Sequence, residues 1–292
     1  MLHHSARLAF VGWLLIGTAA SAQVGPEIAY AKANGSPEIH LINPDGTGDR
    51  LLYSSPRGTE IFHVDIRPGG GQLAIEEHKT PKGAANPTNS AIRIIDYDGN
   101  GSVVGSVRTL QLTCLTGSLD YHPTDGTLLY RNCGPQRIYR LNTTTMASSD
   151  LGLVHDAFIA SWLGATHILY HVNATNLADR KLWTVSTADL SAPIEVVASP
   201  PGTLDTSTSG DKALLSPGSD VRLVDVTAKT IEMFQTEAQR GHFSPDDQKV
   251  IYITGITFGK QGQFIIVRNF DGSGSPANLV GRGKFTALDW RN

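Results

Sequence analysis

Apolar and polar residues alternate along most of the chain in short segments that end at turn-forming residues. One such segment, an alternating strand followed by a polar turn, occurs six times; the copies begin at Glu38, Ile92, Arg137, Lys181, Asp220 and Phe264. Three of them run into Asp-Gly, a dipeptide that suits the positive φ of tight turns. A side-chain period of two predicts β-strands, so the pattern indicates a repeated all-β structure.

A second segment lies between the copies of the first. It has a large or branched residue, a turn centred on Pro or Gly, and a short apolar strand; the copies begin at Ile66, Tyr121, Trp162, Thr208 and Phe243, with an incomplete sixth at Leu288–Trp290. The starts are about 45 residues apart on average, a period typical of propeller blades. The missing strand of the sixth copy has a counterpart at Glu27–Lys32, ahead of the first repeat. We therefore predict a six-bladed β-propeller of four-stranded blades, closed by the N-terminal strand.

The first 22 residues have the features of a secretory signal peptide. Arg7 supplies a positive charge, Leu8–Ala20 is apolar but too short to span a bilayer, and Ala20-Ser21-Ala22 fits a signal peptidase site. We expect cleavage before Gln23, which leaves residues 23–292 as one propeller domain in the periplasm or secreted, without membrane insertion. A membrane anchor is the alternative.

Export also changes the interpretation of Cys114 and Cys133, the only two cysteines. An even number of cysteines in an oxidising compartment favours a disulfide. Its loop would contribute about 3 kcal/mol to stability in the chain-entropy model. Two free buried thiols are the alternative, and neither cysteine belongs to a Cys-x-x-Cys metal motif.

Charge excludes one class of partner. The 24 basic and 27 acidic residues give a net charge of −3, and only 17% of residues are charged. A nucleic-acid-binding protein would show a basic face, so we expect no nucleic-acid partner. A low charged fraction fits sheets that are buried on both faces.

The turn segments resemble a known repeat. Phe243-Ser-Pro-Asp-Asp and His122-Pro-Thr-Asp-Gly are similar to the tryptophan-Ser-Pro-Asp-Gly core of the PD40 (WD40-like) repeat of TolB-like propellers. The resemblance covers about residues 24–292, the propeller part only, and is weakest in the third and fourth blades. It implies that the turn-bearing strand is the innermost one of each blade, and that Tyr121, Trp162, Phe243 and Trp290 are wedges between blades rather than a ligand platform.

The same resemblance places six residues around the axis. Those immediately before the wedge positions are Asp65, Asp120, Ser161, Ser207, His242 and Asp289, while His63 and Asp205 lie two residues further up their strands. If these side chains face the axis, they form an acidic arc that can bind a cation, a basic peptide or a partner loop. The alternative is that the carboxylates accept hydrogen bonds from backbone groups between blades.

Motifs for catalysis are missing. The sequence has no Gly-x-Ser-x-Gly, no His-Glu-x-x-His and no Walker A motif. We therefore expect a non-enzymatic, monomeric scaffold that binds a protein partner and needs no cofactor. The rival hypothesis is a lyase-like, metal-dependent enzyme or small-ligand binder that uses the axial Asp and His residues. The Pro- and Asn-rich segment His78–Ser90 is a further candidate binding loop.

Overall fold

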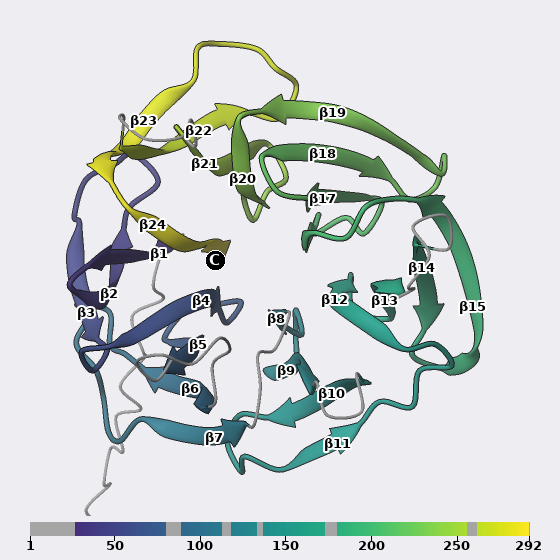
Figure 1. Ribbon diagram of the computed structural model, residues 1–292, viewed down its shortest axis with the longest axis horizontal. Coiled ribbons are helices and arrows are strands. Elements are labelled where there is room, and N and C mark those ends of the chain that lie inside the picture. Colours follow the sequence, from purple (N-terminus) through teal and green to yellow (C-terminus); the bar gives the residue numbers. More distant parts are fainter. Residues whose placement is uncertain are drawn as a thin grey trace, which may run out of the picture.

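A computed structural model shows six antiparallel sheets of four strands arranged in a ring (Figure 1). It describes residues 27–79, 89–112, 118–132, 137–172, 180–255 and 262–291. Within these ranges there is no helix, and hence none with the length and apolar character needed to cross a membrane. The predicted all-β, six-bladed propeller is confirmed. The predicted signal peptide, both cysteines and most of the segment 78–90 lie outside the described residues.

The first five blades each use four consecutive strands, which run in order from the innermost outward. Blade 1 has β4 (Thr59–Ile66), β5 (Gln72–Lys79), β6 (Asn89–Asp96) and β7 (Arg108–Leu112); blade 2 has β8 (Leu119–Tyr121), β9 (Thr127–Asn132), β10 (Arg137–Asn142) and β11 (Ser148–Asp150). Blade 3 has β12 (Ala157–Leu163), β13 (His167–Val172), β14 (Lys181–Ser186) and β15 (Asp189–Ala198); blade 4 has β16 (Thr203–Thr206), β17 (Lys212–Ser216), β18 (Asp220–Asp225) and β19 (Thr230–Thr236). Blade 5 has β20 (Ala238–Phe243), β21 (Lys249–Thr254), β22 (Gln263–Asn269) and β23 (Ala277–Gly283).

Blade 6 joins the two ends of the chain. Its innermost strand is β24 (Phe285–Arg291), followed outward by β1 (Glu27–Asn34), β2 (Ser36–Ile42) and β3 (Arg50–Ser54). Strands β1 and β24 pair antiparallel, with Ile28 opposite Trp290. Figure 1 shows β24 running toward the axis, where the C-terminal end of the chain is marked. This pairing confirms closure of the ring by the N-terminal strand.

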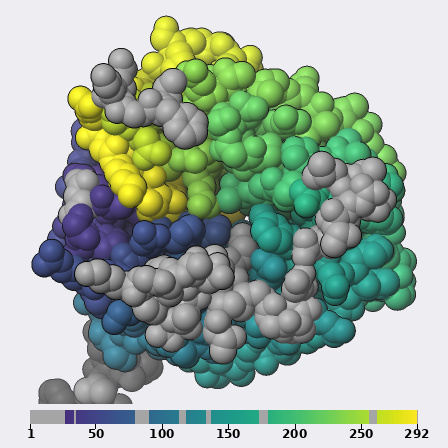
Figure 2. Space-filling view, viewed as in Figure 1, coloured from purple at the N-terminus to yellow at the C-terminus, as the bar shows by residue number. Residues whose placement is uncertain are grey.

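Apolar side chains from adjacent blades form the core. Tyr121, Trp162, Phe243 and Trp290 are all buried, and each lies in a cluster that also holds residues of the preceding blade. Trp162, for example, packs with Leu129 and Ile138 of blade 2. The four aromatic residues are therefore wedges between blades, as expected. In the space-filling view the blades close around a narrow centre (Figure 2).

Register in the inner strands corrects one part of the sequence alignment. Asp65 pairs with Ala74 and Asp120 with Leu129, while in blade 4 it is Asp205 that pairs with the equivalent Leu214. Ser207 instead lies in the turn, where its N–H donates to the carbonyl of Lys212. The alignment was displaced by two residues because blade 4 has no aromatic wedge, and Thr208 was placed at that position.

Candidate axial site

Four aspartates from four inner strands surround the propeller axis. Asp65 lies on β4, Asp120 on β8, Asp205 on β16 and Asp289 on β24, and each is at most 4% exposed. Side chains in a strand alternate between faces, and the register places these four at the same level of their blades. The sequence-predicted arc is thus an arrangement of four carboxylates around one centre.

One oxygen of each carboxylate holds the next blade in place. The Oδ2 atoms of Asp205 and Asp289 accept backbone N–H groups of Phe243 and Ile66 at 2.8 and 2.7 Å. Asp65 and Asp120 accept the N–H groups of Tyr121 and Trp162 in the same way. The donor is always at the wedge position of the following blade. The alternative stated in the sequence analysis, that the carboxylates accept hydrogen bonds from backbone groups between blades, therefore holds for one oxygen of each aspartate.

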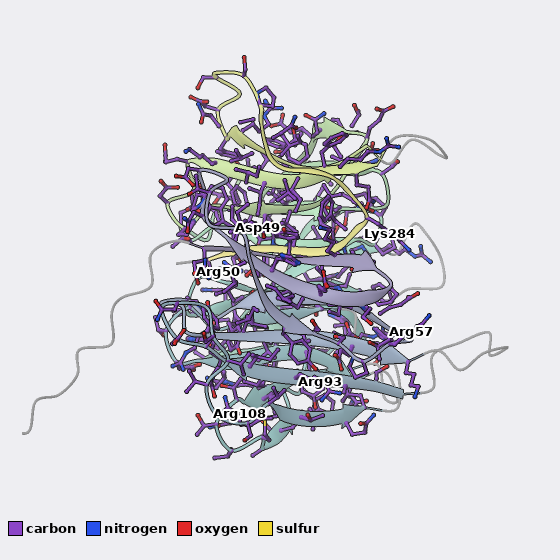
Figure 3. The ribbon with its side chains drawn as sticks, turned by 90° about the vertical axis from the view of Figure 1, so that its left-hand side faces the viewer. Asp49, Arg50, Arg57, Arg93, Arg108 and Lys284 are labelled. Carbon is purple, nitrogen blue, oxygen red and sulfur yellow. The ribbon has the colours of Figure 1, made fainter. Side chains whose placement is uncertain are left out.

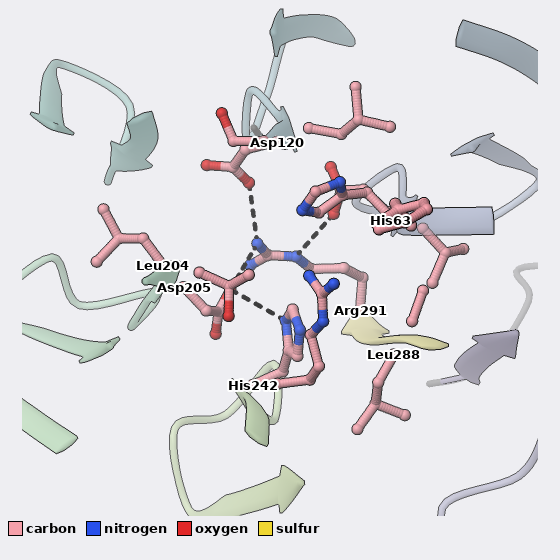
Figure 4. Close-up of a pocket in the computed structure, with 15 residues that line it drawn as sticks. His63, Asp120, Leu204, Asp205, His242, Leu288 and Arg291 are labelled. Carbon is pink, nitrogen blue, oxygen red and sulfur yellow. Dashed lines mark hydrogen bonds and ion pairs between the residues drawn. The ribbon is translucent and has the colours of Figure 1, made fainter. Parts of the chain in front are cut away.

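The other oxygen of each carboxylate faces Arg291. Figure 4 shows Arg291 between Asp120 and Asp205. Arg291 Nη2 donates to Oδ1 of Asp120 and Asp205, both at 3.1 Å. Its Nε lies 3.8 Å from Oδ1 of Asp65 and 3.7 Å from Oδ1 of Asp289. A single guanidinium from the last strand therefore occupies the centre of the arc.

Arg291 was not among the residues predicted to lie at the axis, although its position in the strand indicates it. It follows Asp289 by two residues on the same strand, so the two side chains point to the same face. The repeat alignment compared only positions at and before the wedge, and Arg291 lies one residue beyond Trp290. Arg67 occupies the equivalent position in blade 1, two residues after Asp65, so position alone does not single out Arg291.

Histidine and serine complete the centre. His242 Nδ1 lies 3.3 Å from Asp289 Oδ1 and 3.6 Å from Asp205 Oδ1. Ser161, the third-blade equivalent of the aspartates, donates to Asp120 Oδ2 at 2.6 Å. His63 lines the same end of the channel but hydrogen bonds Glu76 rather than an axial carboxylate. Of the predicted axial set, therefore, His63 and Ser207 lie outside the ionic centre.

Burial and mutual repulsion shift the pKa values of the axial aspartates. Burial, with the charges of Asp289 and Asp120 added, raises the pKa of Asp65 well above its usual range. Burial also raises the pKa of Asp120, to about 6, against the opposing effect of Arg291. For Asp289 burial acts in the same direction, but its hydrogen bond to His242 and the charge of Arg291 prevail and lower its pKa. The centre thus holds four carboxyl groups against two cationic side chains, and this excess of acid favours the protonated forms of Asp65 and Asp120 relative to solution.

The pKa of His242 is also raised, but by its acidic neighbours and not by burial. Burial alone would lower its pKa, but hydrogen bonds and Coulomb attraction to Asp205 and Asp289 outweigh burial and raise the pKa to about 9. The imidazole is therefore a cation at neutral pH. Together with Arg291 it offsets part of the negative charge of the four aspartates.

Three of these groups have the spacing of a metal site. Asp205, His242 and Asp289 offer ligand atoms that lie within 4.8 Å of one another. A divalent cation there would meet the guanidinium of Arg291, which already pairs with Asp205, and a protonated imidazole, which has no lone pair to donate. The donor types suit a metal, but the surrounding positive charge opposes one while Arg291 keeps this position.

Hollows lie on both sides of the Arg291 side chain. On the side of the inter-strand turns, a hollow of about 240 Å³ is lined by Pro68, Pro123, Pro245, Trp162 and Thr208, with Asp120 and Arg291 also at its surface. On the opposite side, a cavity of about 30 Å³ is lined by His63, Arg240 and His242, among others. Arg291 contacts both, so it divides the channel.

A ring of six four-stranded blades with a self-paired ionic centre defines a closed β-propeller. The sequence matches no family model and no curated protein. Among solved structures, TolB from Acinetobacter baumannii is similar at a TM-score of 0.69 and 16% identity over 92% of this chain and 67% of that one. The fold is that of the TolB-like propellers, as the repeat motifs predicted.

Other solved propellers are similar as well. A nidogen/laminin complex matches at a TM-score of 0.65 and 10% identity, over 92% of this chain and 99% of that one. An oligogalacturonate lyase in complex with manganese matches at a TM-score of 0.52 and 12% identity, over 80% and 73% of the two chains. At these identities the similarity concerns the fold.

Proposed function

We propose that this protein is an exported, non-enzymatic propeller that serves as a scaffold for binding another protein. The observation that carries the proposal is the position of Arg291 among the four axial aspartates. The acidic groups hold adjacent blades together and pair with a cation of the same chain. They are therefore committed to the scaffold, and the surface left for a partner is the rigid rim around the centre.

The hollow on the turn side is the part of that rim best suited to a partner. Pro68, Pro123 and Pro245 come from blades 1, 2 and 5 and converge on it, with Trp162 beside them. Proline has a fixed φ, so such a wall loses little conformational entropy when a ligand binds. Its volume of about 240 Å³ suits a few side chains of an inserted loop or peptide rather than a folded domain.

The proposal includes export of the protein, which we infer from the sequence. The apolar segment before Ala20-Ser21-Ala22 has the length of a signal peptide, so the mature protein would begin at Gln23 in the periplasm or outside the cell. We expect a monomer without a cofactor, without a nucleic-acid partner and without membrane insertion. The nidogen/laminin complex is a solved example in which a chain of this fold is found with another protein.

Site-specific photocrosslinking in the native host tests the scaffold function. A photoreactive phenylalanine analogue at Thr208, on the turn-side hollow, should give a defined crosslinked protein band. The same analogue at Thr230, an exposed threonine on the outermost strand of blade 4, is the matched control. Equal crosslinking at the two positions, or none at Thr208 in exported protein, would contradict a binding surface at this face.

A metal-dependent enzyme is the second candidate. The Asp205–His242–Asp289 group and the similarity to a manganese-bound lyase favour it, whereas the charge of Arg291 opposes it. Dialysis against Mn²⁺ followed by elemental analysis separates the two functions. We expect no stoichiometric metal; retention of one ion per chain, lost in Asp205→Asn but kept in the exposed-site control Asp156→Asn, would favour the enzyme instead.

A further inference from the structure

A second cluster of ionisable side chains lies beside the axis, centred on Glu76 of β5. Glu76 is fully buried, with His63 Nδ1 at 2.6 Å from its Oε2 and His78 Nε2 at 3.3 Å from its Oε1. Burial alone would raise the pKa of Glu76, but these hydrogen bonds prevail and lower it to about 2. The carboxylate is thus a permanent negative charge at physiological pH.

Two arginines, Arg131 and Arg240, lie near enough to Glu76 for its charge to act on them. Arg131 is 9% exposed, with its guanidinium 4.5 Å from the ring centre of Phe158, and Arg240 lines two neighbouring cavities. Burial lowers the pKa of both, and Glu76 is the carboxylate that opposes this effect. Within the described part of the chain, Arg240 forms no ion pair. The charge of Glu76 therefore acts on two guanidinium groups, without an ion pair to Arg240 among the described residues.

The backbone at Arg240 is held in a conformation that favours glycine. Its φ is +56°, and it lies in a bulge of β20 where the pairing with β21 shifts between Gln239 and His242. A non-glycine residue in this region costs about 1 kcal/mol or more. The residue that follows is Gly241, yet the positive φ falls on the arginine. Bulges with such strain commonly re-aim a side chain toward a binding site.

Arg240 lies where two cavities meet. The first is the cavity of about 30 Å³ shared with His63 and His242. The second, of about 410 Å³, is walled by Ile61, Phe62 and Phe285, with Arg240 also in its lining. Phe62 and Arg240 belong to both. Glu60 and Lys284, exposed residues at the larger cavity, offset each other in charge.

We propose that these joined cavities bind a small organic monocarboxylate, with its carboxylate against Arg240 and its apolar body between Ile61, Phe62 and Phe285. A guanidinium presents a planar pair of donors that matches a carboxylate. The small cavity has room for one such group, and the larger one has the volume and lining of a small-molecule site. The bound anion would give Arg240 an ion-pair partner.

His63 supplies a second polar contact. Its Nε2 is buried without a hydrogen-bond partner, while Nδ1 is engaged by Glu76. A carboxylate beside Nε2 favours the protonated imidazole, which then donates from both nitrogens. Asp65, Asp120 and Asp205 line the deep end of the same cavity, so a singly charged group fits better than a doubly charged phosphate.

Calorimetric titration of the mature protein with hexanoate, acetate, hexan-1-ol and inorganic phosphate tests this site. Hexanoate should bind at least about tenfold tighter than acetate, because its extra methylene groups are buried. It should also bind at least about tenfold tighter than hexan-1-ol, which lacks the charge, and tighter than phosphate. Tighter binding of phosphate, or equal binding of hexanol, would overturn the assignment of a monocarboxylate.

The deciding variant is Arg240→Gly, which removes the guanidinium and suits the positive φ. It should melt at the wild-type temperature or above it and lose hexanoate affinity by about tenfold or more. Arg57→Gln, at an exposed arginine away from both cavities that Figure 3 labels at the edge of the molecule, should leave the affinity unchanged. Hexanoate binding that survives in folded Arg240→Gly, or is absent from the wild type, refutes the proposal.

Discussion

The Oδ2 atom of Asp289 accepts a hydrogen bond from the backbone N–H of Ile66 at 2.7 Å, across 223 residues of sequence. Asp289 lies on the last inner strand and Ile66 at the end of the first inner strand that follows it around the ring. The bond therefore joins blade 6 to blade 1. It complements the pairing of β1 with β24, which closes blade 6 itself.

Asp289→Ala should weaken ring closure. The substitution leaves the buried N–H of Ile66 without an acceptor and removes a partner of His242, so we expect a loss of about 3 kcal/mol in the free energy of unfolding. Urea denaturation measures it. Asp156→Ala, at an exposed carboxylate with no hydrogen bond among the described residues, should change stability by less than about 0.5 kcal/mol. Similar losses in the two variants would contradict this role of Asp289.

Arg291→Met should destabilise the protein more strongly at neutral than at acidic pH. Without the guanidinium, four buried carboxylates face one another with only His242 as a cation, and we expect a loss of about 4 kcal/mol near pH 7.5.

The pH dependence of that loss follows from the direction of the pKa shifts. Folded-state pKa values of Asp65 and Asp120 are already raised, that of Asp120 to about 6, and removal of the cation raises them further. The folded state then binds more protons than the unfolded state, so stability increases as the pH falls from 7.5 to 5.5. Denaturation curves at the two pH values measure the recovery, with Arg57→Met as the control. A loss independent of pH would contradict the electrostatic cause.

The architecture was predictable because the same pattern of strand and turn residues recurs along the sequence, once in each blade. The strand at Glu27–Lys32 had no partner within its own repeat, and this indicated closure before any contact was known. The axial positions of Asp65, Asp120 and Asp289 followed from the same alignment. The alignment was wrong in blade 4, which has no aromatic residue at the wedge position. Thr208 was aligned with that position, and Ser207 was therefore placed at the level that Asp205 occupies.

Pairing across the axis was not predictable in the same way. Arg291 meets Asp120 and Asp205 from blades 2 and 4, and no local pattern connects residues 86 or 171 positions apart. The cluster around Glu76 was missed for a different reason. His63, Arg131 and Arg240 come from three blades, and the positive φ that directs Arg240 leaves no mark in the sequence.

Cys114 and Cys133 should form a disulfide in protein exported to its native compartment. Both lie outside the described residues, so the bond stays a prediction from the compartment and the cysteine count. Mass spectrometry of non-reduced mature protein should give a mass about 2 Da below that of the reduced form, beginning at Gln23. Two thiols open to alkylation without reduction would contradict it.

His242 should make stability decline at alkaline pH. Its pKa rises from about 6.5 in the unfolded chain to about 9 in the folded state, beside Asp205 and Asp289. A raised folded-state pKa means that the stabilising contribution is complete below pH 6.5 and is lost as the pH rises through 9. The window lies above the pKa of Asp120, which is about 6, so it isolates the histidine from that carboxyl group.

His242→Gln tests this contribution directly. The variant should be less stable than the wild type by up to about 3 kcal/mol at pH 6.5, and the difference should shrink toward zero above pH 9, because the wild type has by then lost its imidazolium. Denaturation curves between pH 6 and 10 at constant ionic strength measure it. His167→Gln, at an exposed histidine whose ring hydrogen bonds the neighbouring Thr166, should follow the wild type throughout. A His242→Gln deficit that stays constant across the window would show that packing, and not the charge, makes the contribution.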